Sequence, residues 1–488
     1  MIAAQMEPRL ALPAGAAFAA AGLAGAAVAL HETAAPAIVG LLALGGLLWL
    51  AWRAGLLDAW ALLLVALLSA NYNVFINANA FIAGGADRGR TITAVATVGL
   101  VLFALAQNEL RRSRGVPVRL GLIDGLMGAL LVVATAAFAR GWSLGNPRVY
   151  LLGDYGQLVQ IVAAYAAVRV FAANAGPAGL RSFLVLLGLA WGLRAAAELL
   201  FPEARGTAVI ILEGQELFRR TDPLGPLALP LLIGLLFSEQ RKDRAILLAG
   251  CLALVATQNV LGFTRAHYLA VGAAIGLLAL VTLWHPQGRG RLLQAAGLVA
   301  VASLLLYATV APFRAVAGDA LHRFEEAFDP TTQSRLHREA EASAVMEGIR
   351  GSPLLGFGLG AEYLGADPDT LQPTTAHFIH DDYLALWMRG GVLLAGVWVA
   401  LLATALWRGL FCQSPLGRLA SAAAAAGVFG IALTGVLSGS AFGYVAGPIT
   451  ALLLAVATWP DADALPAATR ASAAGQARLA VEHGTYGG

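Results

Sequence analysis

Long apolar stretches recur along almost the whole chain, and they constrain its fold more than any other feature. A bilayer hydrocarbon core of about 30 Å takes about 20 apolar helical residues to cross. Runs of roughly this length fall near 10–30, 36–52, 55–70, 91–107, 120–138, 155–172, 181–199, 224–238, 245–261, 266–284, 291–311, 383–407, 418–438 and 441–458. They predict about fourteen transmembrane helices.

The composition argues against a soluble protein of this length. Hydrophobic residues make up 59% of the 488 residues and charged residues only 12%, which is too little charge to cover a soluble surface. We therefore predict an all-α, polytopic transmembrane bundle of about 12–14 spans. The net charge of +3 is small, and no nucleic-acid partner is expected.

The short loops predict the orientation of these spans. With a fourteen-span count, a set of basic residues falls on one membrane face, which the positive-inside rule makes cytoplasmic. This set comprises Arg111, Arg112, Arg114, Arg119, Arg241, Lys242, Arg244, Arg289, Arg291, Arg408 and Arg418. Both termini are then expected on the cytoplasmic side.

The longest polar segment, 312–382, falls on the opposite face. Residues 333–349 within it read as an amphipathic helix, with Leu336, Ala340, Ala344 and Val345 on one face. An ordered loop of this length usually carries function. The predicted organisation is thus about eleven spans in 1–311, the large loop in 312–382, further spans in 383–458, and a disordered cytoplasmic tail in 459–488.

One candidate for chemistry is His380, where the large loop re-enters the membrane beside Asp381 and Asp382. A neutral histidine at a helix start can accept a proton near pH 7. The alternative is an interfacial histidine followed by ordinary helix-capping acids.

Arginines on the same face form the other candidates. Arg265 lies in a tight turn between two apolar helices, where it either reaches the lipid headgroups or binds a pyrophosphate through its planar fork. Arg335 and Arg338 are three residues apart and share a helix face. Their alternative role is a solvated charge network with Glu339 and Glu341.

Neither a metal site nor a cofactor site is expected. The eight histidines are scattered, without a His-x-x-x-His pair beside an acid. No glycine-rich nucleotide loop follows a strand. Use of ATP or of a sugar nucleotide is therefore unsupported.

Three segments together resemble the O-antigen ligase and polymerase superfamily of lipid-linked glycan transferases. SPLLGFGLG at 352–360 resembles the Pro-Leu-Leu-Gly-x-Gly stretch of that family's large periplasmic loop. HDDYLALWMRGG at 380–391 resembles its His-Asn-x-Tyr-Leu…Gly motif, and FTRAHYLA at 263–270 resembles its Ser-Arg-Gly segment. Arg335 sits where the family usually has an arginine upstream of Pro-Leu-Leu-Gly. Asp381 departs from the usual asparagine.

The resemblance implies a GT-C-like helical fold in a bacterial inner membrane, with the active site facing the periplasm. It also implies an inverting, metal-independent transfer of a glycan from undecaprenyl diphosphate. In that reaction His380 would activate the acceptor hydroxyl, while Arg265 and Arg335 would hold the diphosphate leaving group. Neighbouring substrate contacts are predicted for Arg338, Asp381, Tyr383 and His377.

The sequence leaves the acceptor open. We favour ligation to a lipid A–core acceptor over polymerisation of glycan repeats, and polymerisation over transfer to protein hydroxyls. The alternative from another class is a transporter or flippase for an anionic lipid, which many spans and buried arginines also fit. Transporters commonly show two related halves, and no such internal symmetry is visible in this chain.

Overall fold

The computed structural model describes much of the helical part of the chain. The described residues are 56, 58–69, 86–114, 120–200, 208–212, 215–219, 224–260, 265–284, 318, 333–366, 373–412, 414, 416–438 and 446–459. The expected spans at 10–30, 36–52 and 291–311 lie outside them. So does the expected tail from residue 460 onward.

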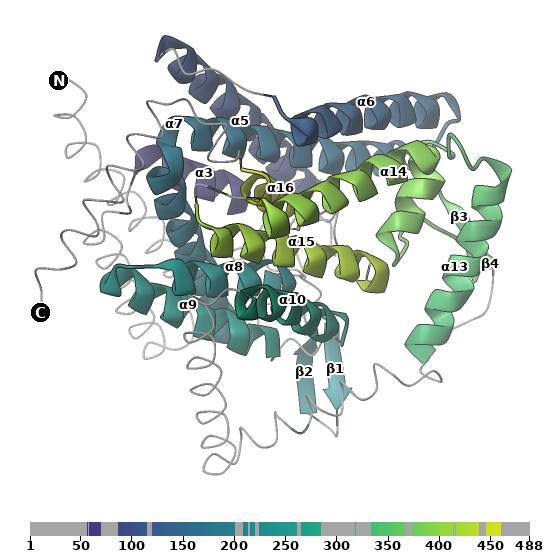
Figure 1. The fold of residues 1–488 in the computed structure, drawn as a ribbon. Coiled ribbons are helices and arrows are strands. Elements are labelled where there is room, and N and C mark those ends of the chain that lie inside the picture. The colour runs from purple at the N-terminus through teal and green to yellow at the C-terminus, as the bar shows by residue number, and fades with distance from the viewer. Residues whose placement is uncertain are drawn as a thin grey trace, which may run out of the picture.

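Helices dominate the described residues, with two short antiparallel hairpins between them (Figure 1). The helices are α3 (Ala59–Ser69), α5 (Ala86–Ser113), α6 (Leu122–Ser143), α7 (Arg148–Leu200), α8 (Leu224–Ser238), α9 (Lys242–Val260), α10 (Arg265–Leu283), α13 (Gln333–Gly351), α14 (Asp382–Phe411), α15 (Arg418–Ser438) and α16 (Ala446–Ala457). The strands are β1 (Ala208–Leu212) paired with β2 (Gln215–Arg219), and β3 (Tyr363–Ala366) paired with β4 (Pro373–Ala376). These hairpins were not predicted from the sequence.

Six helical segments among the described residues are long and apolar enough to cross a bilayer. They are Ala94–Ser113, Leu122–Ser143, Arg148–Ala196, Ala266–Leu283, Asp382–Phe411 and Arg418–Leu437. The chain is thus an α-helical, multi-pass membrane protein, as its composition predicted. The expected total of about 12–14 spans includes segments outside the described residues.

Helix α7 is two helices that double back on each other. Gly176 has a φ of +67°, which interrupts the helix just before Pro177. The rings of Phe171 and Phe183 lie 5.3 Å apart, whereas twelve residues of continuous helix would separate them by about 18 Å. The chain therefore reverses here, and the runs at 155–172 and 181–199 form two separate helices.

Helix α15 lies at the centre of the bundle, against α8, α10, α14 and α16. Its alanine-rich face allows close helix contacts, as is common where membrane helices cross. A side chain at Gly409 of α14 would lie 2.6 Å from the Ala425 Cβ, and Leu278 of α10 packs on Ala422 and Ala426.

Contacts at one end of the bundle join several of the loops predicted to be cytoplasmic. Arg181, just after the reversal in α7, donates to the Ser238 carbonyl at 3.0 Å and to the Leu416 carbonyl at 2.8 Å. Shortly before the reversal in α7, Arg169 forms a salt bridge of 3.1 Å with Asp124 in the first turn of α6. The loops after α5, α8 and α14 therefore share one end, as the sequence predicted.

The opposite end is organised by the segment Ser352–Gly360, which we call the glycine wedge. Its three glycines, Gly356, Gly358 and Gly360, have φ values of +65°, +81° and +74°. Residues with side chains rarely adopt this conformation. The sequence of the wedge therefore fixes a tight path that a chain without glycines could not follow.

Each wedge glycine lies against the backbone of a different helix. A Cβ at Gly356 would lie 2.6 Å from the Met388 carbonyl oxygen of α14. A Cβ at Gly358 would overlap the backbone of Gly141 in α6, and one at Gly360 would come within 2.6 Å of the backbone of α7. The wedge thus locks α6, α7 and α14 together where α14 begins.

Polar side chains complete this junction. Arg140 of α6 donates from Nε to the Gly356 carbonyl at 2.8 Å. Asn146, between α6 and α7, donates to the carbonyls of Phe357 and Leu359, both at 2.9 Å. These bonds satisfy carbonyls that the tight backbone path leaves without helical partners.

Candidate functional site

The start of α14 brings two of the sequence-predicted residues, His380 and Asp381, to the end of the bundle. Asp381 is the N-cap of the helix, and its carboxylate accepts from the backbone nitrogens of Tyr383 at 2.8 Å and Leu384 at 3.0 Å. Asp is a preferred residue at this position because it satisfies otherwise unpaired N–H groups. The structure therefore gives Asp381 a capping role, the alternative raised from the sequence.

His380 is held by Glu341 of α13. Oε1 of Glu341 accepts from the His380 backbone nitrogen at 2.6 Å, and Oε2 lies 2.8 Å from Nδ1 of the imidazole. An ionised carboxylate can only accept hydrogen bonds. Nδ1 of a neutral His380 therefore carries the proton, and Nε2 keeps a lone pair.

Exposure differs sharply between the two side chains of this pair. The His380 side chain is 33% exposed, whereas that of Glu341 is 5% exposed. Burial would raise the pKa of the Glu341 carboxyl, but hydrogen bonds from the side chain and backbone of His380 outweigh it and hold this pKa below its usual range. The buried Glu341 carboxylate thus holds the imidazole of His380 in place, and part of that imidazole is open to solvent.

The helix α13 docks through a different face from the one expected. Glu341, Val345 and Ile349 are buried, and the two apolar residues pack with Ile379 and Met388. Leu336, expected on the buried face, is 55% exposed. Ala340 is also exposed and Ala344 is half-buried, so the predicted face was wrong except for Val345. The buried face of α13 therefore includes Glu341, whose carboxylate pairs with His380.

Arg338 and Tyr383 both bind the backbone of α15. Arg338 donates from Nη1 to the Leu437 carbonyl in the last turn of α15. The Tyr383 hydroxyl donates to the Ala432 carbonyl at 2.9 Å. These two predicted substrate residues therefore join α13 and α14 to the end of α15, beside His380.

Arg265 and Arg335 are described only through their backbones, since the structure does not describe their side chains. Arg335 is one helical turn before Arg338 on α13. Helix α10 runs antiparallel to α15, because Ala274 contacts Gly430 while Leu278 packs on Ala422. Its first residue, Arg265, lies about 13 Å before Ala274, at the end of α15 that Arg338 contacts.

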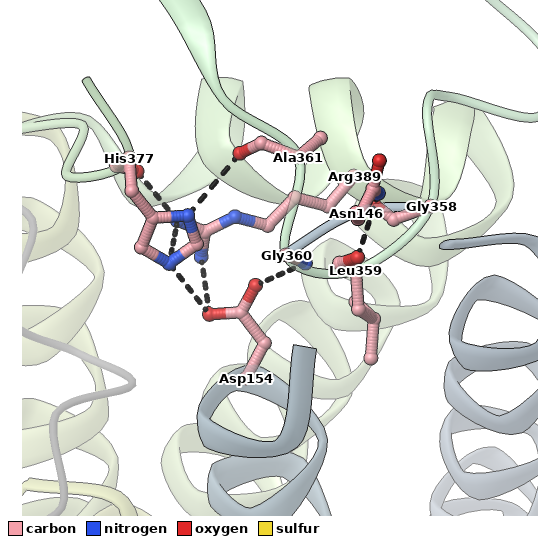
Figure 2. Close-up of polar contacts among 8 residues, drawn as sticks. All are labelled: Asn146, Asp154, Gly358, Leu359, Gly360, Ala361, His377 and Arg389. Carbon is pink, nitrogen blue, oxygen red and sulfur yellow. Dashed lines mark hydrogen bonds and ion pairs between the residues drawn. The ribbon is translucent and has the colours of Figure 1, made fainter. Parts of the chain in front are cut away.

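The predicted substrate residue His377 belongs to a separate, largely buried network (Figure 2). Its Nε2 lies 3.2 Å from Oδ1 of Asp154 in α7, and its Nδ1 lies 3.2 Å from the Ala361 carbonyl. Arg389 of α14 binds the same carboxylate oxygen at 3.1 Å and donates to the His377 carbonyl at 2.9 Å. The structure thus places His377 in an ion-paired junction between helices.

The glycine wedge also ends on this junction. The Gly360 nitrogen donates to Oδ2 of Asp154 at 2.8 Å, as Figure 2 shows. The His377 ring stacks on Tyr150, with ring centroids 4.1 Å apart and planes 6° apart. Asp154 therefore ties α7 to the wedge, to His377 and to α14 at once.

Asp154 was not predicted from the sequence, and Glu341 was placed only in a solvated charge network with Arg335 and Arg338. Arg389 lies within the apolar run at 383–407, and Asp154 directly precedes the run at 155–172. Charged residues within membrane spans usually pair with one another. This tendency could have suggested that Asp154 pairs with Arg389. Glu341 follows His337 by four residues, but its choice of His380 depends on how α13 docks.

No protein-family model and no curated protein matches this chain. The candidate function therefore rests on the geometry at the start of α14 and on the sequence resemblance described above.

Proposed function

We propose that the chain is a glycosyltransferase that moves a glycan from undecaprenyl diphosphate to an acceptor hydroxyl at the periplasmic face of a bacterial inner membrane. The observation that carries the proposal is His380, fixed by Glu341 at the start of an apolar helix with Nε2 as the free acceptor. A positioned base of this kind accelerates proton transfer by about 10²–10⁴-fold.

The reaction is an inverting displacement at the anomeric carbon of the donor glycan. His380 Nε2 takes the proton of the acceptor hydroxyl while that oxygen forms a bond to the anomeric carbon. The bond from this carbon to the diphosphate oxygen breaks, and the lipid diphosphate leaves with the electron pair. No oxidant or nucleotide is needed for this balance.

The leaving diphosphate needs positive charge at the same end of the bundle. Arg335 and Arg338 lie one turn apart on α13, and the first residue of α10, Arg265, lies at the same end of α15. Guanidinium groups pair bidentately with phosphate oxygens, and fixed charges stabilise a transition state without reorganising. This supports the expected roles of Arg265 and Arg335.

Two of the ion pairs described in the helical bundle do not favour the transporter alternative. Asp154 is paired with Arg389 at 3.1 Å, and Asp124 with Arg169 at 3.1 Å. Each of these pairs joins two elements of the bundle, which is a structural use of intramembrane charge. We therefore favour the transferase, with ligation to lipid A–core ahead of repeat-unit polymerisation.

The test is transfer by full-length protein, purified in nanodiscs, from an undecaprenyl-diphosphate-linked glycan to a lipid A–core acceptor or to a second donor molecule. We expect His380→Ala to lower the rate by at least about 100-fold. Near-normal transfer by this variant would remove His380 from the mechanism.

Glycolipid gels of a gene-deletion strain distinguish the acceptors. Loss of capped lipopolysaccharide, with polymer retained on the lipid carrier, indicates ligation. If the deletion strain caps its lipopolysaccharide with single repeats, the protein is a polymerase. Unchanged glycolipids would contradict both forms of the proposal.

A further inference from the structure

Three side chains that bind metals well meet where α13 packs against the start of α14. His337 and Glu341 are four residues apart, so they project from one helix face. His380 contacts Glu341, and its ring lies edge-on to that of His337, with centroids 6.1 Å apart. One ligating atom from each residue lies within 4.8 Å of the other two, the one such trio found among the described residues.

Two imidazoles and a carboxylate are a common ligand set for Zn²⁺, with a fourth position open to water. Atoms bound at about 2.0 Å in a tetrahedral site are about 3.3 Å apart. The contact of 2.8 Å between Glu341 and His380 would thus open by about 0.5 Å. His337 is only half-buried, so rotation of its side chain can bring the third ligand closer.

We propose that His337, Glu341 and His380 form a binding site for a divalent transition-metal ion, with Zn²⁺ the best fit. Nitrogen ligands disfavour Mg²⁺ and Ca²⁺, which prefer oxygen. The exposed part of the His380 side chain gives an ion access from solvent, while the buried Glu341 carboxylate supplies the charge.

The site has a direct consequence for transfer, which rests on the proposed function. A metal bound through His380 Nδ1 takes the lone pair of that nitrogen, so the ring proton must lie on Nε2. Nε2 can then no longer accept the proton of an acceptor hydroxyl. Occupation by Zn²⁺ therefore inhibits a transferase that itself works without a metal.

Metal binding is measured on full-length protein in detergent. The protein is first treated with a chelator to remove bound metal, and the chelator is then removed. Co²⁺ is titrated into the protein while the visible absorption of the bound ion is recorded. The affinity for Zn²⁺ is then measured by competition with a chromogenic chelator. We expect one equivalent to bind with a tetrahedral Co²⁺ spectrum. His337→Ala should weaken binding by at least about tenfold, and Glu347→Gln, which removes an exposed acid later on α13, should not.

Equal affinity in the wild type and His337→Ala, or no cobalt spectrum in the wild type, would overturn the site. His337→Gln keeps a polar side chain of similar size and must show the same loss. The assay contains neither donor nor acceptor, so its outcome is independent of the transferase. In the transfer assay, Zn²⁺ should inhibit the wild type at least tenfold more strongly than His337→Ala, and EDTA should reverse the inhibition.

Discussion

The two oxygens of the Glu341 carboxylate accept different hydrogen bonds. One accepts from the backbone nitrogen of His380, and the other accepts from its imidazole. An amide at this position can offer only one acceptor. Either the His380 backbone nitrogen loses its partner, or Nδ1 faces a donor and the ring proton moves to Nε2. Both outcomes disturb the proposed base.

We therefore expect Glu341→Gln to lower the transfer rate by about 100-fold while the KM for the donor stays nearly constant. Steady-state kinetics in nanodiscs measure both values, and Glu341→Asp should recover part of the rate because it restores two acceptors. Glu347→Gln is the matched control on the same helix. A normal rate in Glu341→Gln would show that the carboxylate does not set the tautomer of His380.

Asp154 and Arg389 contribute to stability and not to the proposed base, because they form a buried ion pair between α7 and α14. Their side chains are 7% and 14% exposed, so neither charge is well solvated when its partner is removed. Arg389→Met should lower the free energy of unfolding by about 3–5 kcal/mol. The Asp154→Leu, Arg389→Met double variant should lose less than the two single variants together.

Thermal unfolding in detergent measures these differences. Arg241→Met is the control, since Arg241 pairs with Asp243 at 2.6 Å but is half-exposed, and such surface pairs contribute about 0–1 kcal/mol. Strict additivity of the Asp154 and Arg389 variants would mean that the two charges act independently.

At the scale of elements, the glycine wedge holds three helices through backbone contacts that leave no room for a side chain. Gly358→Ala combines an unfavourable φ with overlap on Gly141, and we expect a loss of about 2–4 kcal/mol in unfolding free energy. Gly145→Ala is a matched control, because Gly145 also has a positive φ of +77° but has no atoms within 4 Å of a Cβ.

The control should lose only about 1–2 kcal/mol, the cost of the backbone conformation alone. Both values come from the same thermal unfolding measurement. Equal losses at the two positions would show that close helix contact contributes nothing to the wedge.

The order of the described helices could largely be predicted from sequence, while the site could be predicted only in part. Hydrophobic runs mark the spans because a segment in lipid must satisfy its backbone polar groups within its own helix. The reversal at Gly176 lies between two of the predicted spans. His380 was recognised because a histidine at a helix start can accept a proton near pH 7. The segment 333–349 also proved helical, as α13.

Partners far apart in sequence could not be predicted. The buried face of α13 carries Glu341 against His380, a polar contact that the periodicity of apolar residues does not predict. The hairpins β1–β2 and β3–β4 are similarly short and lack a clear alternating pattern. In both cases tertiary contacts, rather than local preference, determine the structure.

At the scale of the whole molecule, exposed tryptophans mark the two ends of the bundle. Trp142 closes α6 at the end that holds His380, while Trp284 and Trp407 lie at the opposite end, with exposures of 54%, 85% and 65%. Tryptophan is enriched at both membrane interfaces. Helix α6, at 22 residues, spans about 33 Å, which matches the hydrocarbon core.

The proposed orientation can be tested by cysteine labelling in intact cells. In a Cys412→Ser background, Leu364→Cys in β3 should react with a membrane-impermeant maleimide. Gln240→Cys, in the loop after α8, should react only after the cells are permeabilised, because that end carries the basic loops. Cys251 is buried and should stay silent. The reverse labelling pattern would place His380 on the cytoplasmic side.

The junction at Asp154 also has a consequence for biogenesis. Its contact with Gly360 joins positions 206 residues apart, so a ribosome making about 5–20 residues per second needs roughly 10–40 s to supply that partner. Until then the first half of α7 carries an uncompensated acid among apolar residues. A chain that stops before the wedge therefore keeps this acid without the partners that it has in the folded protein.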